Sequence, residues 1–139
     1  ANRGWMDPGD TTMNRFQMAE VLSHCADWLF GDIKRIKDEF IELDAGLIDF
    51  LIERRESPLL AVKVNSGIAS PLIVDEAQRC AVELQRRIGK PISPCVVANS
   101  VPASVRRHAI AHGVEMLAVP VQQFEALAVE TGLRQPRAA

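Results

Sequence analysis

The chain has 139 residues, of which 47% are apolar and 24% charged, a composition typical of one folded globular domain rather than a disordered chain. Lysine and arginine number 16 against 18 acidic residues, so the net charge of -2 gives no general attraction to phosphate or to an anionic membrane. No apolar run could span a bilayer, and residues 1–10 lack the apolar core of a signal peptide. A cytoplasmic location without a membrane partner is expected.

The first half of the chain predicts a helix and a β-hairpin. Residues 1–12 lack periodicity and are expected to be disordered or derived from a cloning vector. Apolar residues recur at helical spacing over 13–30, which predicts one helix. Residues 32–43 fit a helix and a strand equally, so their type stays open. Residues 47–54 and 58–65 are rich in Ile, Leu, Phe and Val, and predict two strands joined by a three-residue connection.

The second half alternates helices and strands. An apolar stripe predicts a helix over 72–88, ended by Gly89, and a buried strand follows at 95–98. A short helix over 102–111 and a strand over 114–119 complete a βαβ unit, which implies parallel strands. A last amphipathic helix covers 121–131. We expect a single α/β domain over 13–132 and a flexible tail over 133–139.

One stretch carries a specific resemblance. The order helix, hairpin, helix, strand, together with GLIDFLIERRESPLLAVKVNSG, resembles the PD-(D/E)XK nuclease family over Met13 to Val119. The resemblance implies a restriction-endonuclease-like core, with a mixed central sheet flanked by helices, and an ancestral role in cleaving DNA or RNA. In active members, a strand aspartate and an acid on the next strand hold Mg²⁺, and a lysine two residues later assists the attacking water.

The family motif is only half preserved in this sequence. Its aspartate corresponds to Asp49, which is the candidate metal ligand. On the next strand, Ala61-Val62-Lys63 keeps the lysine without the acid, while Lys63-Val64-Asn65 keeps neither and fits the surrounding residues better. Asp49, Lys63 and Asn65 are therefore the candidate catalytic positions, and one carboxylate alone makes a poor Mg²⁺ site.

An acid elsewhere could complete the site. The candidates in suitable regions are Glu20, Glu53 and Asp75, although Glu20 lies far from the apolar stripe of its helix and is expected to face solvent. The three-residue connection would instead place Asp49 directly opposite Lys63 across the hairpin. We hypothesise that an ion pair between them has replaced the metal. The alternatives are a solvated hairpin edge, or a two-residue turn that separates the pair.

Basic and histidine pairs offer further candidate sites. Candidate nucleic-acid contacts are three arginine pairs, each of which could equally form a solvated face: Arg54 and Arg55, Arg86 and Arg87, Arg106 and Arg107. His108 and His112 would project from one helical face as metal-binding pairs do, but no third ligand is evident in the sequence, which favours a solvated helix end. The cysteines Cys25, Cys80 and Cys95 are widely spaced and are expected in the core.

The sequence favours a catalytically impaired nuclease-like domain that binds DNA, RNA or a protein and needs no cofactor. The alternative is an active endonuclease with a rearranged acidic site, which would require Mg²⁺. A further possibility treats the sheet as a scaffold, with exposed apolar surface such as the Phe124 helix forming a homodimer or partner interface.

Overall fold

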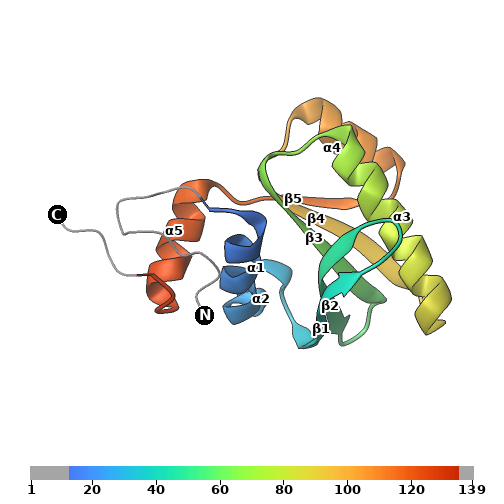
Figure 1. The fold of residues 1–139 in the computed structure, drawn as a ribbon, viewed down its shortest axis with the longest axis horizontal. Helices are drawn as coiled ribbons and strands as arrows, with labels where there is room; N and C mark the ends of the chain where they lie inside the picture. The colour runs from blue at the N-terminus through green and yellow to red at the C-terminus, as the bar shows by residue number, and fades with distance from the viewer. Residues whose placement is uncertain (1–12, 135–139) are drawn as a thin grey trace.

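The computed structural model describes residues 13–134, which form an α/β domain around one mixed sheet (Figure 1). The strands follow the order β1-β2-β3-β4-β5 across the sheet. The β1–β2 and β2–β3 pairs are antiparallel, and the β3–β4 and β4–β5 pairs are parallel. Their bounds are β1 (Ile33–Glu42), β2 (Leu47–Arg54), β3 (Leu59–Ile68), β4 (Ile92–Ser100) and β5 (Glu115–Ala118).

Helices cover both faces of the sheet. One face packs against α1 (Arg15–His24), α2 (Ala26–Phe30) and α5 (Val121–Glu130), and the other against α3 (Pro71–Ile88) and α4 (Ala103–Ala111). Strand β4 shows the division clearly, because Cys95 and Val97 face α1 and α5 while Val96 and Ala98 face α3 and α4. Burial on both faces explains the continuous apolar run that marked this strand in the sequence.

The expected single helix over 13–30 is wrong, because the chain breaks at Cys25 between α1 and α2. Two side chains compete for one carbonyl there. Ser23 donates its hydroxyl to the Glu20 carbonyl, and the His24 ring lies 2.9 Å from the same oxygen. Such local bonds divert acceptors from the helix ladder and favour its termination. The start of α1 is well defined by a capping box between Asn14 and Gln17.

The segment whose type was left open is the edge strand β1. Its pairing with β2 shifts register twice, between Ile33 and Arg35 and between Ile36 and Asp38. Each shift adds a residue and breaks the two-residue period of the strand. Apolar residues therefore recur at a spacing that imitates a helix, which explains the ambiguity of the sequence pattern.

The register predicted for the hairpin is confirmed. Strands β2 and β3 pair Phe50 with Val62, Leu51 with Ala61 and Ile52 with Leu60. Continued by one residue, the same register places Asp49 opposite Lys63. This is the pairing that the three-residue connection predicted. The remaining expected strands and helices are all present, with ends that differ by a few residues.

The end of the described chain is packed against the domain. On α5, Phe124 and Ala128 have no exposed surface and pack in the core with α1, so the expectation that the Phe124 helix forms an exposed interface is wrong. Leu133 also packs on this core, and the Arg134 side chain is only 5% exposed. The expectations for residues 1–12 and 135–139 lie outside the described residues.

None of the helices within residues 13–134 combines the length and apolar character needed to cross a bilayer.

One acidic side chain of α3 holds the turn between β1 and β2. The two carboxylate oxygens of Glu83 accept the backbone amides of Asp44 and Ala45, each at 2.9 Å. These bonds, led by that of Asp44, hold the pKa of Glu83 below its usual value. The carboxylate therefore stabilises the fold above its unfolded-state pKa, and this stabilisation is lost as pH falls through the folded-state pKa.

We therefore expect Glu83→Gln to lower the melting temperature at pH 7 and to have little effect at a pH below the folded-state pKa, where the wild-type carboxyl is also neutral. Thermal denaturation followed by circular dichroism across this range measures the difference. Glu56→Gln, at an exposed position of the β2–β3 turn, is the control for loss of one charge. Equal melting temperatures for Glu83→Gln and wild type at pH 7 would contradict the expectation.

Candidate functional site at the fork of β2 and β3

Asp49 and Lys63 lie where β2 and β3 separate. Pairing between the strands ends at Phe50 and Val62, and the side chains of Asp49 and Lys63 at the next position have no exposed surface. The backbone amide of Val64 donates to Asp49 Oδ2 at 2.7 Å. The carboxylate therefore anchors β2 to β3 at the point where the ladder stops.

The ion-pair partner of Asp49 is Arg15, at the start of α1. Arg15 Nη2 donates to Asp49 Oδ2 at 2.7 Å, and the arginine side chain is 27% exposed. The hypothesised ion pair between Asp49 and Lys63 is therefore wrong, although the two residues are cross-strand neighbours. Helix α1 supplies the cation instead, because its first turn lies over the fork.

Lys63 pairs with a carboxylate from α3. Its Nζ lies 2.5 Å from Glu76 Oε2 and also donates to the carbonyl oxygen of Leu47. Lys63 is fully buried, whereas the Glu76 side chain is 34% exposed. The ammonium therefore joins β3 to both β2 and α3.

Glu76 was not among the acids considered from the sequence, yet its position carried a signal. It lies three residues after Ile73 and four before Cys80, so it belongs to the apolar stripe of α3. A single acid within an apolar stripe requires a buried partner. That partner is Lys63.

A glycine leaves room for this contact. A Cβ atom at Gly46 would lie 2.8 Å from Glu76 Oε2, and the φ of Gly46 is +152°, which disfavours other residues. A larger residue would push the Glu76 carboxylate aside. The glycine before β2 therefore helps Glu76 to reach Lys63.

The charge of Asp49 is poorly compensated. Its Oδ1 is buried and has no hydrogen-bond partner among residues 13–134. Burial raises the pKa of Asp49, while the Arg15 hydrogen bond, the Val64 amide and the charge of Lys63 oppose the rise. A buried charge that destabilises the native state is typical of a functional site or of a relic of one.

The residues present do not fit a resident Mg²⁺. The fork has two carboxylates, but each already pairs with a cation of the chain, Asp49 with Arg15 and Glu76 with Lys63. A divalent ion would have to displace one of these cations, and Mg²⁺ prefers several oxygen ligands and water in octahedral geometry. Two features favour a metal: Asp49 Oδ1 has no hydrogen-bond partner among the described residues, and the Glu76 side chain is partly exposed.

The two remaining motif positions lie apart from this chemistry. Ala61 is fully buried in an apolar cluster with Cys80 and Leu84 of α3. Asn65 pairs with Ala98 of β4 and is partly exposed. In the part of the chain that the structure describes, its side chain makes no hydrogen bond to Asp49 or Lys63.

The acids considered as replacements are engaged elsewhere or lie outside the contacts of Asp49. Glu53 forms ion pairs with Lys34 and Arg35 of β1. Asp75 pairs with His108 of α4. Glu20 lies on α1 but is not among the partners of Asp49, whose carboxylate is held by Arg15 and Val64.

The arginine pair of α4 lies apart from the arginine pair at the end of α3. Arg54 and Arg55 lie at the β2–β3 turn, Arg86 and Arg87 in the last turn of α3, and Arg106 and Arg107 on α4. Helix α4 meets α3 near Asp75, eleven residues before Arg86, a distance of roughly 16 Å along the helix. Two of these six arginines also form ion pairs, Arg55 with Asp32 and Arg87 with Glu83.

A hollow of about 410 Å³ lies beside the fork, lined by Phe16, Phe40, Glu42 and Leu47. The rings of Phe16 and Phe40 are 6.1 Å apart, and Phe16 is 44% exposed. Phe40 stands opposite Asp49 in the β1–β2 register and has a φ of +53°, an uncommon conformation for a bulky residue. Strained backbone of this kind is concentrated at functional sites.

We expect Asp49→Asn to raise the melting temperature of the metal-free protein at pH 7, because burial raises the pKa of Asp49 and its charge therefore destabilises the fold. The amide keeps an acceptor for Val64 but removes the buried charge. The gain should shrink as pH falls through the folded-state pKa of Asp49, because the wild-type carboxyl is then neutral, and vanish below its unfolded-state value of about 3.8. Thermal denaturation in EDTA over this pH range measures the effect, and a lower melting temperature at pH 7 would contradict it.

Comparison with solved structures identifies the fold. The chain superposes on the complex described as EndoMS with double-stranded DNA with a TM-score of 0.68 and 14% identity, covering 84% of this chain and 46% of that one. A repair endonuclease from Pyrococcus abyssi gives a TM-score of 0.67 at 14% identity, covering 80% and 49%. EndoMS in its apo form gives 0.64 at 15%, covering 78% and 47%.

No protein-family model matches the sequence, and no curated protein matches it significantly. The chain spans less than half the length of the endonucleases that it resembles in structure. At these identities the likeness concerns the fold. The five-stranded mixed sheet flanked by helices is thus similar to the fold of repair endonucleases.

Proposed function

We propose that this domain is a PD-(D/E)XK-type nuclease fold in which internal ion pairs have replaced the metal centre, and that it binds nucleic acid without cutting it. The observation that carries the proposal is the pairing of both fork carboxylates with cations of the chain itself. Asp49 and Lys63 are also fully buried, so neither side chain is open to a substrate.

Phosphodiester hydrolysis makes demands that this arrangement does not meet. A metal-dependent nuclease needs an ion that activates water and neutralises developing charge, with access to the phosphate. At this fork, Ala61 stands where one alignment of the motif requires an acid, and the Lys63 ammonium is used by Leu47 and Glu76. These residues hold α1, the hairpin and α3 together instead of presenting a reaction centre.

The hollow beside the fork is the proposed nucleic-acid contact. Phe16 offers an exposed ring on which a base could stack, and the Arg15 guanidinium lies 6.0 Å from that ring and is partly exposed. An aromatic ring beside a cation is the usual arrangement for binding a base and its phosphate. The EndoMS structure described as a complex with double-stranded DNA supports the choice of ligand.

A second candidate function is Mg²⁺-dependent endonuclease activity, with Asp49 and Glu76 as the acidic pair. The partnerless Oδ1 of Asp49 favours it, because a buried carboxylate oxygen without a donor suits a cation. The partial exposure of Glu76 also favours it. One experiment separates the two candidates.

We expect calorimetric titration with Mg²⁺ and Mn²⁺ to show no binding that depends on Asp49, and no cleavage of single- or double-stranded DNA or RNA. Asp49→Asn and Glu76→Gln should match wild type in both assays. Glu53→Gln, which removes one charge from β2 outside the fork, is the control. Cleavage that is lost in Asp49→Asn and Glu76→Gln but kept in Glu53→Gln would establish the second candidate and refute the first.

We expect Phe16→Ala to weaken DNA binding by roughly fivefold or more, because stacking of one base contributes about 1–3 kcal/mol. Fluorescence anisotropy with labelled single- and double-stranded oligonucleotides in EDTA and low salt measures the affinity. Ile110→Ala is the matched control, since Ile110 is an apolar residue of α4 that is 73% exposed. An equal loss in both variants, or no binding by wild type, would contradict the proposed contact.

A further inference from the structure

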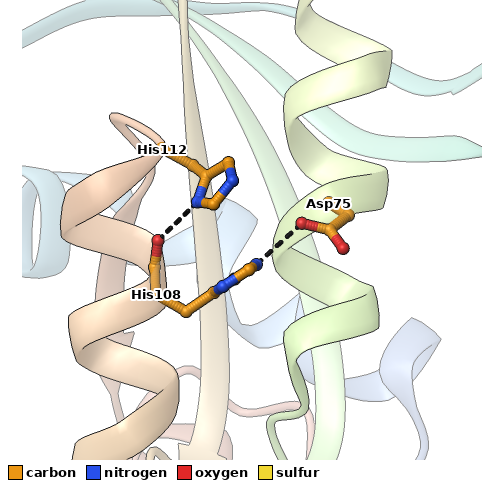
Figure 2. A group of neighbouring side chains, drawn as sticks. All are labelled: Asp75, His108 and His112. Atoms are coloured by element: carbon orange, nitrogen blue, oxygen red, sulfur yellow. Dashed lines mark hydrogen bonds and ion pairs between the residues drawn. The ribbon is translucent and has the colours of Figure 1, made fainter.

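We propose that Asp75, His108 and His112 form a binding site for a first-row divalent metal ion, with Zn²⁺ as the ion that fits best (Figure 2). Asp75 lies on α3 and the two histidines on α4. One potential ligand atom from each residue lies within 4.8 Å of the others. This cluster shares no residue with the fork of β2 and β3.

The spacing of the histidines places both rings on one face of α4. Residues four apart on a helix project to the same side, and the two ring centroids lie 4.2 Å apart. Asp75 faces them from the neighbouring helix, with its Oδ1 2.8 Å from His108 Nε2. The third ligand that the sequence did not reveal is therefore supplied by α3.

The hydrogen bonds prepare one imidazole for metal binding. His112 Nδ1 lies 2.8 Å from the backbone carbonyl oxygen of His108. Because a carbonyl oxygen only accepts hydrogen bonds, Nδ1 is the donor and carries the proton. The lone pair of neutral His112 is then on Nε2, which Figure 2 shows on the side of Asp75. A second ring nitrogen bonded to a carbonyl is the usual way in which proteins orient a metal-binding histidine.

The neutral ring of His108 can bind a metal through Nε2 once its proton is on Nδ1. In the structure, His108 Nε2 faces Asp75 Oδ1, and the proton of this hydrogen bond lies between the two atoms. When the neutral ring moves this proton to Nδ1, a metal ion can take its place between His108 Nε2 and the carboxylate. No co-reactant is required, because only the tautomer of the ring changes.

The distances suit a small adjustment. Tetrahedral zinc with bonds of roughly 2.0–2.1 Å separates neighbouring ligand atoms by roughly 3.4 Å. The ligand atoms now lie within 4.8 Å of one another, so the distance between any two of them has to shorten by roughly 1.4 Å at most. The helices beneath are fixed, because Val74, Ala77 and Ala109 are fully buried around the cluster.

The donor set selects the class of metal. Two imidazoles and one carboxylate suit zinc and similar transition metals, whereas Mg²⁺ prefers oxygen ligands. Three protein ligands leave a fourth position for water or another ligand. The competing explanation is that His108 and Asp75 form only an ion pair that fastens α4 to α3, with Arg79 adding positive charge near Asp75.

Titration with Zn²⁺ alone, followed by calorimetry, and Co²⁺ absorption spectroscopy test the proposal. We expect one zinc ion per chain and, with Co²⁺, the intense visible bands of tetrahedral coordination. His112→Ala should weaken zinc binding by at least about tenfold. His24→Ala, which removes the one histidine outside the cluster, should bind as wild type does.

Two further variants keep the test decisive. His112 is exposed, so its replacement should leave the melting temperature of the metal-free protein unchanged, while added zinc should raise that of wild type alone. Asp49→Asn, which is expected to be more stable than wild type, should keep zinc binding, and this excludes the fork as the site. The proposal is overturned by absence of stoichiometric binding, by unchanged binding in His112→Ala, or by binding that is lost in Asp49→Asn.

Discussion

The fold is organised around one buried positive charge. An ammonium group without contact to water is unstable by several kcal/mol unless its protons are all received by good acceptors. Lys63 has two such acceptors for its three N–H groups, the Leu47 carbonyl of β2 and the Glu76 carboxylate of α3. Strand β2 and helix α3 must therefore keep fixed positions around β3. Arg15 adds helix α1 to the same network, because it pairs with Asp49 of β2.

Internal ion pairs and a metal ion solve the same electrostatic problem in different ways. Carboxylates that converge at a strand fork repel one another and need positive charge between them. A metal supplies that charge from solvent and leaves open positions for water and substrate, whereas lysine and arginine supply it permanently and close the site. Within residues 13–134, Asp49 Oδ1 is a buried oxygen without a hydrogen-bond partner, so the cations of the chain leave one acceptor of the fork unsatisfied.

The sequence predicted those features that depend on local pattern. The apolar run of β2, the apolar start of β3 and the three residues between them determined the hairpin register, and the alternation that follows predicted the parallel strands. The ion pairs could not be predicted in the same way. Arg15 and Glu76 come from helices whose rotation and position against the sheet depend on tertiary packing, so the choice of partners followed from the three-dimensional fold.

The errors have physical causes of the same kind. Two register shifts gave β1 a helical spacing, and side-chain bonds to the Glu20 carbonyl ended α1 early. Helix α5 showed an apolar face in the sequence that a surface partner could have covered. In the structure α1 covers that face, because the two helices share one side of the sheet.

Neighbouring acids on α3 have different partners, and this limits how the helix can move. Asp75 contacts α4, and Glu76 contacts β3. Because successive residues of a helix are about 100° apart around its axis, the two bonds hold α3 from two directions. Rotation of α3 about its axis would break both contacts at once. Asp75 and Glu76 together therefore fix the rotation of the longest helix of the described domain.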